Sequence, residues 1–291
     1  MPLFHRFKSM LPRGRLNVGK RFVLLHEAIS GTMSSFYMAR ELDTEQVVGL
    51  KILDPAKTAV FEARFKGLPK PCEGEIAMQL KHPRIVDTRE YGLTTEGAQY
   101  LVMEYLEGPN MNTALAAHDP CLEGQRVRFI RQAAEAVMAV HEAGFIHRDI
   151  CPRNFLLSNS RADLKLIDFG LTVPATRWFM LPGNRTGTPN YMAPELVRRR
   201  ATDRRLDVFA FGVMAYEFCT FELPWRRGTD GMAAMTHDRP PVDIYQFRPH
   251  INPQLAKAIH ACIEPDVSKR CPSIEAFLRM IKGVLDDEED L

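Results

Sequence analysis

Three side chains with oxygen ligands stand at a spacing that suits a metal-dependent reaction. The stretch "HRDICPRN" places Asp149 and Asn154 five residues apart, and "LKLIDFG" places Asp168 a further 14 residues along. The intervening "FLLSNSRADLKLI" is typical of two short strands joined by a polar turn. Such a hairpin would bring the three side chains together at its open end. Two carboxylates and an amide oxygen suit Mg²⁺ that is held together with substrate phosphates.

Strands are expected to dominate the chain before this group. "RFVLLHEAI" (21–29), "VVGLKIL" (47–53) and "YLVMEYL" (100–106) are rich in branched and aromatic residues and are bounded by polar turns. "EGPN" (107–110) has the composition of a turn and is a plausible link between two halves. The first part of the chain is therefore predicted to be a small, strand-rich lobe.

Helices are expected to dominate the second half. Apolar residues recur every three or four positions in "QRVRFIRQAAEAVMAVHEAG", and Gly144 is a natural stop for that helix. "DVFAFGVMAYEFC" (207–219) is apolar nearly all round and is predicted to be a buried helix. "NPQLAKAIHACI" and "PSIEAFLRMIKGVL" read as amphipathic helices, each with a proline near its first turn.

Composition sets limits on partners and location. The formal net charge of +2 over 291 residues predicts neither nucleic-acid nor membrane binding. The six cysteines form no C-x-x-C pair, as expected for reduced thiols in a cytoplasmic protein. No apolar run is long enough for a transmembrane segment, and the basic start is not a signal peptide. Residues 1–19 are predicted to be a basic tail and residues 285–291 an acidic tail. The oligomeric state stays open.

Further motifs follow the first group in order. "GTPNYMAPE" (187–195) and "DVFAFGV" come after Asp-Phe-Gly, and a lysine lies in "VVGLKIL". Together with "HRDxxxxN" they make the chain resemble a eukaryotic-type (Hanks-type) Ser/Thr protein kinase over about residues 20–284. The resemblance implies an α+β, two-lobed fold. A small antiparallel-sheet N-lobe with one main helix would span residues 20–107, and a larger helical C-lobe residues 108–284.

The resemblance also implies an activity. It would be the transfer of the γ-phosphate of ATP, with Mg²⁺, to Ser or Thr hydroxyls of a protein substrate. One alternative is a pseudokinase that acts as a nucleotide-binding or scaffolding regulator. Another is a kinase of small molecules, against which "GTPNYMAPE" speaks, because that segment forms a peptide platform in the family.

Catalytic and metal-binding roles are carried over from the family by position. Lys51 would pair with the α- and β-phosphates, with Glu73 as its partner and Glu75 as the fallback. Asp149 would accept or orient the proton of the substrate hydroxyl. Asn154 and Asp168 would hold Mg²⁺.

Nucleotide-binding roles fall mostly on the strand before the turn. Met103 would be the gatekeeper, and Glu104 and Leu106 would offer backbone groups to adenine. Asn110 would lie near the ribose.

Structural roles fall on four other residues. Glu195 and Arg270 resemble the buried ion pair of the larger lobe, and Asp207 would anchor the catalytic loop from below. His147 is interpreted as a core histidine, not as a catalytic base.

The glycine-rich loop departs from the family pattern. Counting back from Lys51 aligns Phe36 with the valine of G-x-G-x-x-G-x-V. The three glycine positions of that pattern then fall in "ISGTMS", where only Gly31 is a glycine. Ile29 and Ser34 replace the other two glycines. Glycine lets the backbone approach a phosphate closely, so weaker binding of ATP is expected. The "GTM" resembles the "GGM" of bacterial members.

A second departure concerns charge near the transferred phosphate. Most Ser/Thr kinases carry a lysine two residues after the catalytic aspartate, where this chain has Cys151. Arg153 stands four residues after Asp149, a position at which tyrosine kinases commonly carry arginine. A guanidinium has the reach and the fixed charge to stabilise phosphoryl oxygens, so Arg153 is predicted to substitute for the lysine.

The activation segment implied by the resemblance is "LTVPATRWFMLPGNRTGTPNYMAPE" (171–195), which carries four threonines. Arg148 is of the type that often receives a phosphate from this segment. Thr186 is the favoured phosphorylation site, with Thr172 and Thr176 as other candidates, while Thr188 is expected in the turn that contacts the substrate.

Overall fold

The computed structural model describes residues 15–26, 29–30, 33–183, 185–225 and 236–285. The chain divides into two compact units. The first comprises Met1–Lys81 and Val86–Leu106, and the second comprises His82–Ile85 and Glu107–Leu291.

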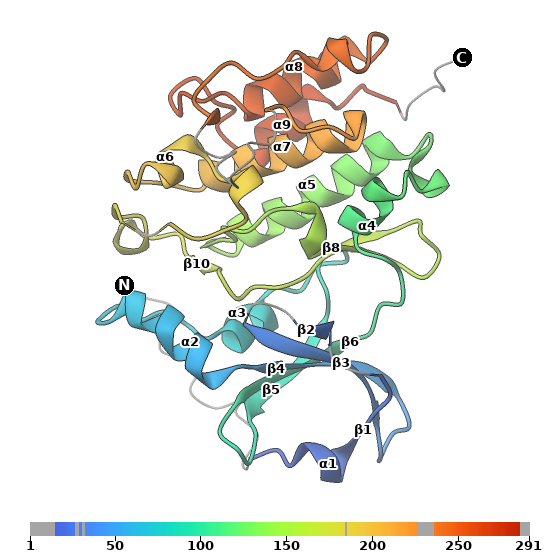
Figure 1. Ribbon diagram of the computed structural model, residues 1–291, viewed down its shortest axis with the longest axis vertical. Helices are drawn as coiled ribbons and strands as arrows, with labels where there is room; N and C mark the ends of the chain where they lie inside the picture. The colour runs from blue at the N-terminus through green and yellow to red at the C-terminus, as the bar shows by residue number, and fades with distance from the viewer. Residues whose placement is uncertain (1–14, 27–28, 31–32, 184, 226–235, 286–291) are drawn as a thin grey trace. The chain divides into compact units, whose positions relative to one another are not determined.

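The first unit is built on an antiparallel sheet. Its strands follow the order β1-β3-β4-β6-β5, and β2 also pairs with β3 (Figure 1). The strands are β1 (Phe22–Leu24), β2 (Ile29–Ser30), β3 (Ser34–Glu41), β4 (Val47–Leu53), β5 (Thr88–Leu93) and β6 (Gln99–Glu104). Alternation along these strands separates the two faces of the sheet.

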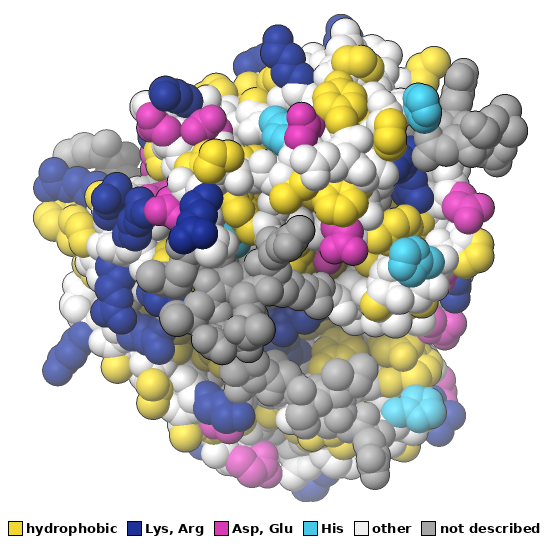
Figure 2. Space-filling model, turned by 45° about the horizontal axis from the view of Figure 1, so that its top comes forward, with side chains coloured by type: hydrophobic (Ala, Val, Ile, Leu, Met, Phe, Trp, Pro, Cys, Tyr) yellow, Lys and Arg dark blue, Asp and Glu magenta, His cyan; other side chains and the backbone are white. Residues whose placement is uncertain are grey.

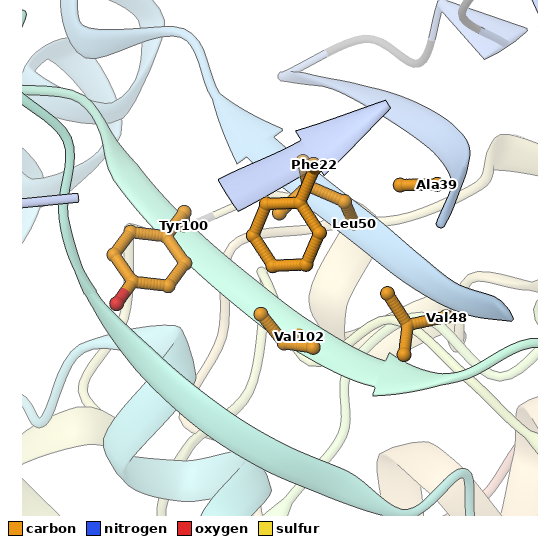
Figure 3. Close-up of a cluster of buried hydrophobic side chains, with 6 residues drawn as sticks. All are labelled: Phe22, Ala39, Val48, Leu50, Tyr100 and Val102. Carbon is orange, nitrogen blue, oxygen red and sulfur yellow. The ribbon is translucent and has the colours of Figure 1, made fainter. Parts of the chain in front are cut away.

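One face of the sheet carries a hydrophobic cluster. Figure 3 shows its members, which come from β1, β3, β4 and β6: Phe22, Ala39, Val48, Leu50, Tyr100 and Val102. Residues between these positions point to the other face. Phe36 is paired with Lys51 and Gly49 with Met103, so these four residues share the face opposite the cluster.

The predicted strand "RFVLLHEAI" is not continuous, and this prediction was wrong in extent. Leu24 pairs with Ala39 and Ile29 with Phe36, so the register against β3 differs by two residues between the two pairings. A change of register of this kind breaks the ladder. The strand is therefore split into β1 and β2.

Three helices complete the first unit: α1 (Val18–Arg21), α2 (Pro55–Glu62) and α3 (Glu73–Gln79). The sequence analysis did not predict α2. Its start is nevertheless encoded locally, because Pro55 occupies the first turn and the Asp54 carboxylate accepts hydrogen bonds from the amides of Ala56 and Lys57.

The second unit is mainly helical. Its helices are α4 (Met111–Ala116), α5 (Arg126–Glu142), α6 (Pro194–Val197), α7 (Arg205–Thr220), α8 (Pro253–Cys262) and α9 (Ile274–Met280). The helix predicted around 207–219 is confirmed as α7, which is buried along nearly its whole length and packs against α5 and α8 (Figure 1). Gly144 follows α5 with φ +84°, as a helix stop requires. In α9 the N-cap is Ser273, so Pro272 precedes the helix.

Two short antiparallel pairs complete the second unit. They join β7 (Phe145–Ile146) to β10 (Val173–Pro174), and β8 (Phe155–Leu157) to β9 (Leu164–Leu166). The second pair is the hairpin that the sequence predicted. No helix in the described ranges is both long and apolar enough to cross a membrane.

Candidate active site

Asp207 holds the backbone that precedes the candidate catalytic residue. Its carboxylate accepts hydrogen bonds from the amides of His147 and Arg148, both at 2.8 Å, and lies 2.9 Å from His141 Nε2. Complete burial would raise the pKa of Asp207, but the hydrogen bond and charge of His141, together with His147 and the Arg148 amide, lower it overall. Asp207 therefore stays ionised and anchors the loop, as the resemblance implied.

Asp149 is fixed at both carboxylate oxygens. Thr188 donates to Oδ1 from its amide at 2.8 Å and from its hydroxyl at 2.7 Å. Asn154 Nδ2 donates to the Asp149 carbonyl oxygen at 2.7 Å and to Oδ2 at 3.1 Å. A carboxylate held in this way keeps one orientation, as general acid–base chemistry requires.

Arg153 supplies a cation beside this carboxylate. Its Nη2 donates to Thr188 Oγ1 at 2.9 Å, so a chain of two hydrogen bonds runs from Arg153 through Thr188 to Asp149. Burial would lower the pKa of Arg153, but its interactions with Cys151 and with the carboxylates of Asp149 and Asp168 raise it overall. The guanidinium is therefore charged at every physiological pH.

Cys151 occupies the position at which most relatives of this type carry lysine. The residue is fully buried, and its Sγ lies 3.6 Å from Thr188 Oγ1. Burial, with the charge of Asp149, raises the pKa of the Cys151 thiol to about 11. A neutral thiol at physiological pH cannot neutralise a phosphate, so within this cluster only Arg153 has that capacity.

The hairpin brings the candidate metal ligands to one end. Asn154 precedes β8 and Asp168 follows β9, and Phe155 pairs with Leu166 between them. Asp168 has φ +65°, and its Oδ1 accepts a hydrogen bond from the Gly170 amide at 3.1 Å.

The chemistry of these two ligands fits Mg²⁺. Because Asn154 Nδ2 is directed at Asp149, the amide oxygen of Asn154 remains as the donor for a cation. Within the described ranges, no group of three or more His, Cys, Asp and Glu side chains could hold a metal ion. If Mg²⁺ binds here, Asn154 and Asp168 would hold it together with oxygens of a phosphate.

His147 is a core residue. It is fully buried, its Nδ1 accepts from the Asp149 amide at 3.3 Å, and its ring lies edge-on to Phe169. These contacts hold the imidazole in the interior of the second unit, beside the backbone of Asp149.

In the first unit, Lys51 forms a buried ion pair with Glu73. Lys51 Nζ lies 2.6 Å from Glu73 Oε1, and the two side chains are 10% and 5% exposed. The fallback residue, Glu75, instead caps α3 through the Cys72 amide at 2.9 Å. Gly74 permits this geometry, because a Cβ there would lie 2.4 Å from Tyr91.

An aromatic ring covers the lysine face of the sheet. A Cβ on Gly49 would lie 2.8 Å from Phe36 Cζ and 3.1 Å from Met103 Cγ, so the glycine makes room for the phenyl ring. Phe36 also stacks on Tyr105, with ring centroids 6.5 Å apart. The sequence pattern aligns Phe36 with the family valine but does not reveal its contact with Gly49.

The other predicted nucleotide-binding residues are divided between the two units. Glu104 ends β6, and its side chain accepts from the Asp87 amide at 2.8 Å. Leu106 is the last residue of the first unit. Asn110 lies in the second unit and caps α4, accepting from the Thr113 amide at 2.9 Å, so its contact with a ribose stays a prediction.

The predicted glycine-rich loop is described only in part. The backbone of Ile29 lies in β2, paired with Phe36. Gly31 lies outside the described residues.

Thr188 and Thr186 differ in their surroundings. Thr188 contacts Asp149 and Arg153, as expected for the turn at a substrate site. Thr186, the favoured phosphorylation site, is buried, and its hydroxyl has no hydrogen-bond partner in the described chain. Phosphorylation at Thr186 would therefore require its segment to open first.

The predicted ion pair of the larger unit is present. Arg270 donates to both oxygens of Glu195, at 2.7 and 2.9 Å, and both side chains are buried. Arg270 also donates to three backbone carbonyl oxygens, those of Glu264, Pro265 and Arg205. This network ties the activation segment to the loop before α9.

The sequence is similar to those of a known family of proteins. The sequence matches the family model described as "Protein kinase domain" over residues 25–280. The chain belongs to the protein kinase domain family. The resemblance seen in the sequence and the two-lobed fold class are confirmed by this match.

Curated kinases of bacteria and animals are similar to this kinase domain. "Serine/threonine-protein kinase pkn3" of Myxococcus xanthus is 30% identical over 267 residues, which cover 87% of this chain and 48% of that protein. "Serine/threonine-protein kinase PknB" of Mycolicibacterium smegmatis is 31% identical, with 77% and 36% covered. "Aurora kinase A-B" of Xenopus laevis is 29% identical, with 88% and 58% covered. The chain thus spans less than two thirds of the length of each of these relatives.

The names of these relatives can be compared with the pseudokinase alternative. Each is named as a kinase, and two are named as Ser/Thr kinases of bacteria. The pseudokinase alternative receives no support from them.

Proposed function

We propose that this kinase domain is an active, ATP- and Mg²⁺-dependent protein kinase that phosphorylates serine or threonine. The hydrogen-bond chain from Arg153 through Thr188 to Asp149 carries the proposal. It places a permanent cation beside an oriented carboxylate, although the usual lysine is replaced by Cys151.

The reaction would be an in-line phosphoryl transfer. The hydroxyl oxygen of the substrate forms a bond to the γ-phosphorus of ATP, while the bond from that phosphorus to the β–γ bridging oxygen breaks and ADP leaves. Asp149 orients the hydroxyl and takes its proton. Because Asp149 Oδ1 accepts two hydrogen bonds from Thr188 and Oδ2 accepts one from Asn154, we assign the proton to Oδ2.

Charge stabilisation would come from three groups on the protein. Arg153 stabilises the equatorial oxygens of the transferring phosphoryl group, which hold the developing charge. Lys51, oriented by Glu73, pairs with the non-transferred phosphates. Asn154 and Asp168 hold Mg²⁺, which supplies neutralising charge to the β- and γ-phosphates when bound.

A cytoplasmic location is part of this proposal. All six cysteines are free thiols, and four of them are buried. Unpaired thiols are usual in a reducing compartment.

The test is incorporation of labelled γ-phosphate into the protein itself and into a generic protein substrate. Wild type should incorporate label with Mg²⁺, lose it with EDTA, and lose it on Asp149→Asn, which keeps the size of the side chain. A thermal shift with MgATP checks that the variant still folds and binds nucleotide. If wild type transfers nothing while MgATP still stabilises it, the pseudokinase alternative is correct. If label enters a small hydroxylated metabolite and no protein, the chain is a kinase of small molecules.

A further inference from the structure

An arginine-rich segment follows α6 and plays no part in the chemistry described above. The stretch "RRRATDRR" carries five arginines at residues 198–205. Two are neutralised, since Arg198 pairs with Asp238 and Arg205 with Asp203. The other three, Arg199, Arg200 and Arg204, are exposed, and none makes an ion pair with any residue that the structure describes.

A surface pocket of about 570 Å³ opens beside this segment. Its lining includes Arg198, Arg200 and Arg205, together with apolar Pro194 and Val267. Four acidic residues also line it.

The acidic residues of the pocket are already engaged. Glu195 is paired with Arg270, Asp203 with Arg205 and Asp238 with Arg198. Asp266 accepts from the amide and hydroxyl of Ser268 at 2.9 and 2.7 Å. Of the three arginines that line the pocket, Arg200 is therefore the one without an ion-pair partner among the described residues.

The segment is joined to the catalytic residues by a short stretch of chain. From Thr188 the backbone passes through a 3-10 turn (Pro189–Tyr191) into α6, which is four residues long and ends one residue before Arg198. A hollow at Asp149 and Thr188 is lined by Leu196 of α6, and the pocket beside the arginine-rich segment is lined by Pro194 of the same helix. Four helical residues span about 6 Å, whereas an extended peptide advances about 3.3 Å per residue. A peptide at Asp149 would therefore reach the arginines within a few residues.

The same surface offers apolar contacts. Trp178 and Leu181 are 52% and 55% exposed, and the Arg177 guanidinium lies 4.3 Å from the centre of the Trp178 ring. The Thr202 amide donates to the Met180 carbonyl oxygen at 3.0 Å, which fixes the arginine-rich segment beside these residues. Figure 2 shows Lys and Arg side chains gathered on the left of the view, the side on which α6 lies in Figure 1, with hydrophobic side chains among them.

We infer that Arg199, Arg200 and Arg204, called here the arginine cluster, form a subsite for Asp- and Glu-rich segments of a protein substrate. The inference rests on the proposed function, since the segment would lie a few residues from the phosphorylated hydroxyl. Guanidinium groups bind carboxylates through two parallel hydrogen bonds. The exposed apolar side chains nearby can contact the apolar side chains of the same peptide.

A peptide fits this surface better than a nucleic acid or a membrane. Carboxylates of Asp203, Asp238 and Asp266 lie between the arginines, and the whole chain has a net charge of only +2. A polyanion or an anionic bilayer requires a continuous basic surface, which these carboxylates interrupt. A short acidic segment needs only a few unpaired arginines.

The first arm of the test measures phosphorylation of matched peptides. Three serine peptides would carry, on either side of the serine, a block of Glu, of Gln or of Lys. Each exposed ion pair contributes little to binding, but the contributions of three arginines add. We therefore expect kcat/KM for the Glu peptide to exceed that for the Gln peptide by about tenfold at low salt. The difference should shrink as salt is added. Equal rates for the Glu and Gln peptides would overturn the inference.

Matched variants assign the preference to the cluster. The triple variant Arg199→Gln, Arg200→Gln, Arg204→Gln should lose the preference while its rate on the Gln peptide stays near wild type. The control, Arg128→Gln, Arg161→Gln, Arg279→Gln, removes the same charge from exposed arginines elsewhere and should keep it. Replacing the three cluster arginines with Glu should shift the preference to the Lys peptide. If the control loses the preference equally, the effect comes from overall charge and the inference is wrong.

A binding measurement separates this inference from the proposed function. Fluorescence polarisation would follow a labelled Glu-rich peptide that contains no hydroxyl residue, with wild type and both triple variants. Binding that only the cluster variant loses supports the subsite even if no phosphate is transferred. Phosphotransfer without binding or preference supports the kinase and overturns the subsite. Tighter binding of a single-stranded oligonucleotide or of phosphatidylserine vesicles at the cluster would replace the peptide as the ligand and overturn it as well.

Discussion

Arg153 Nη2 lies 2.9 Å from Thr188 Oγ1, and the same hydroxyl donates to Asp149 Oδ1 at 2.7 Å. The cation and the carboxylate that we propose to be catalytic are therefore joined through one threonine. The positive charge is carried by Arg153, four residues after the aspartate. Cys151, two residues after the aspartate, is a buried neutral thiol and cannot carry it. The site keeps a cation although the lysine of the family pattern is absent.

Removing the threonine hydroxyl should weaken this link. Thr188→Val keeps the shape of the side chain but removes its donor and acceptor, so Arg153 and Asp149 lose their shared partner. We expect kcat to fall by about tenfold to a hundredfold, the effect of losing one or two charge-assisted hydrogen bonds at a reacting centre. Thr188→Ser should stay close to wild type. A Thr188→Val enzyme with unchanged kcat would contradict the bridging role.

Gly49 should tolerate no side chain while Phe36 is present. In Gly49→Ala the new Cβ would lie 2.8 Å from Phe36 Cζ and displace the ring. If the ring contacts the nucleotide, KM for ATP should rise several-fold with little change in kcat. Combining Gly49→Ala with Phe36→Val should restore KM, because the smaller side chain vacates the space. The steric explanation fails if the double variant has a higher KM than Gly49→Ala alone.

Breaking the ion pair between Arg270 and Glu195 should destabilise the second unit. Arg270→Ala leaves a buried carboxylate without its partner, and loss of one member of such a pair costs about 3–5 kcal/mol. Arg270→Met combined with Glu195→Leu should cost less than Arg270→Ala, since neither charge is then left unpaired. Unfolding in urea, followed by circular dichroism, measures the differences. A smaller loss of stability for Arg270→Ala than for the double variant would contradict this account.

His237 should make folding sensitive to mild acid. The side chain is buried, and its Nδ1 lies 2.7 Å from the Met192 carbonyl oxygen. Burial lowers the pKa of His237 below its ordinary value of 6.5, so the unfolded chain takes up a proton more readily than the folded chain. The free energy of unfolding should therefore decline as the pH falls below 6.5, and His237→Gln should reduce that slope. An unchanged slope in His237→Gln would contradict this role of the buried imidazole.

Features encoded locally could be predicted from the sequence. The spacing between Asn154 and Asp168 predicts the hairpin, because the strands and the turn lie within one short segment. The stop of α5 at Gly144 follows from the φ that glycine adopts there. The sequence analysis overlooked α2, although Asp54 and Pro55 provide a capping signal.

Contacts between distant segments could not be predicted in the same way. His141 follows the same three-and-four spacing as the apolar residues of its helix, whereas the structure pairs it with Asp207, 66 residues further on. The bond between Thr188 and Asp149 spans 39 residues and depends on the path of the activation segment. Phe36 and Gly49 meet because of the register of β3 against β4, which the composition of neither strand specifies.

The most direct test of the central claim compares phosphotransfer by wild type, Arg153→Ala, Cys151→Lys and the variant that combines both changes. If Arg153 supplies the missing cation, Arg153→Ala should lower kcat by about a hundredfold to a thousandfold, as expected for the loss of one preorganised stabilising group. Adding Cys151→Lys to Arg153→Ala should then recover at least about tenfold, because an ammonium group returns to the active site. Cys151→Lys alone controls for the effect of placing lysine at a buried position. Wild-type kcat in Arg153→Ala, with activity still abolished by Asp149→Asn, would contradict the account.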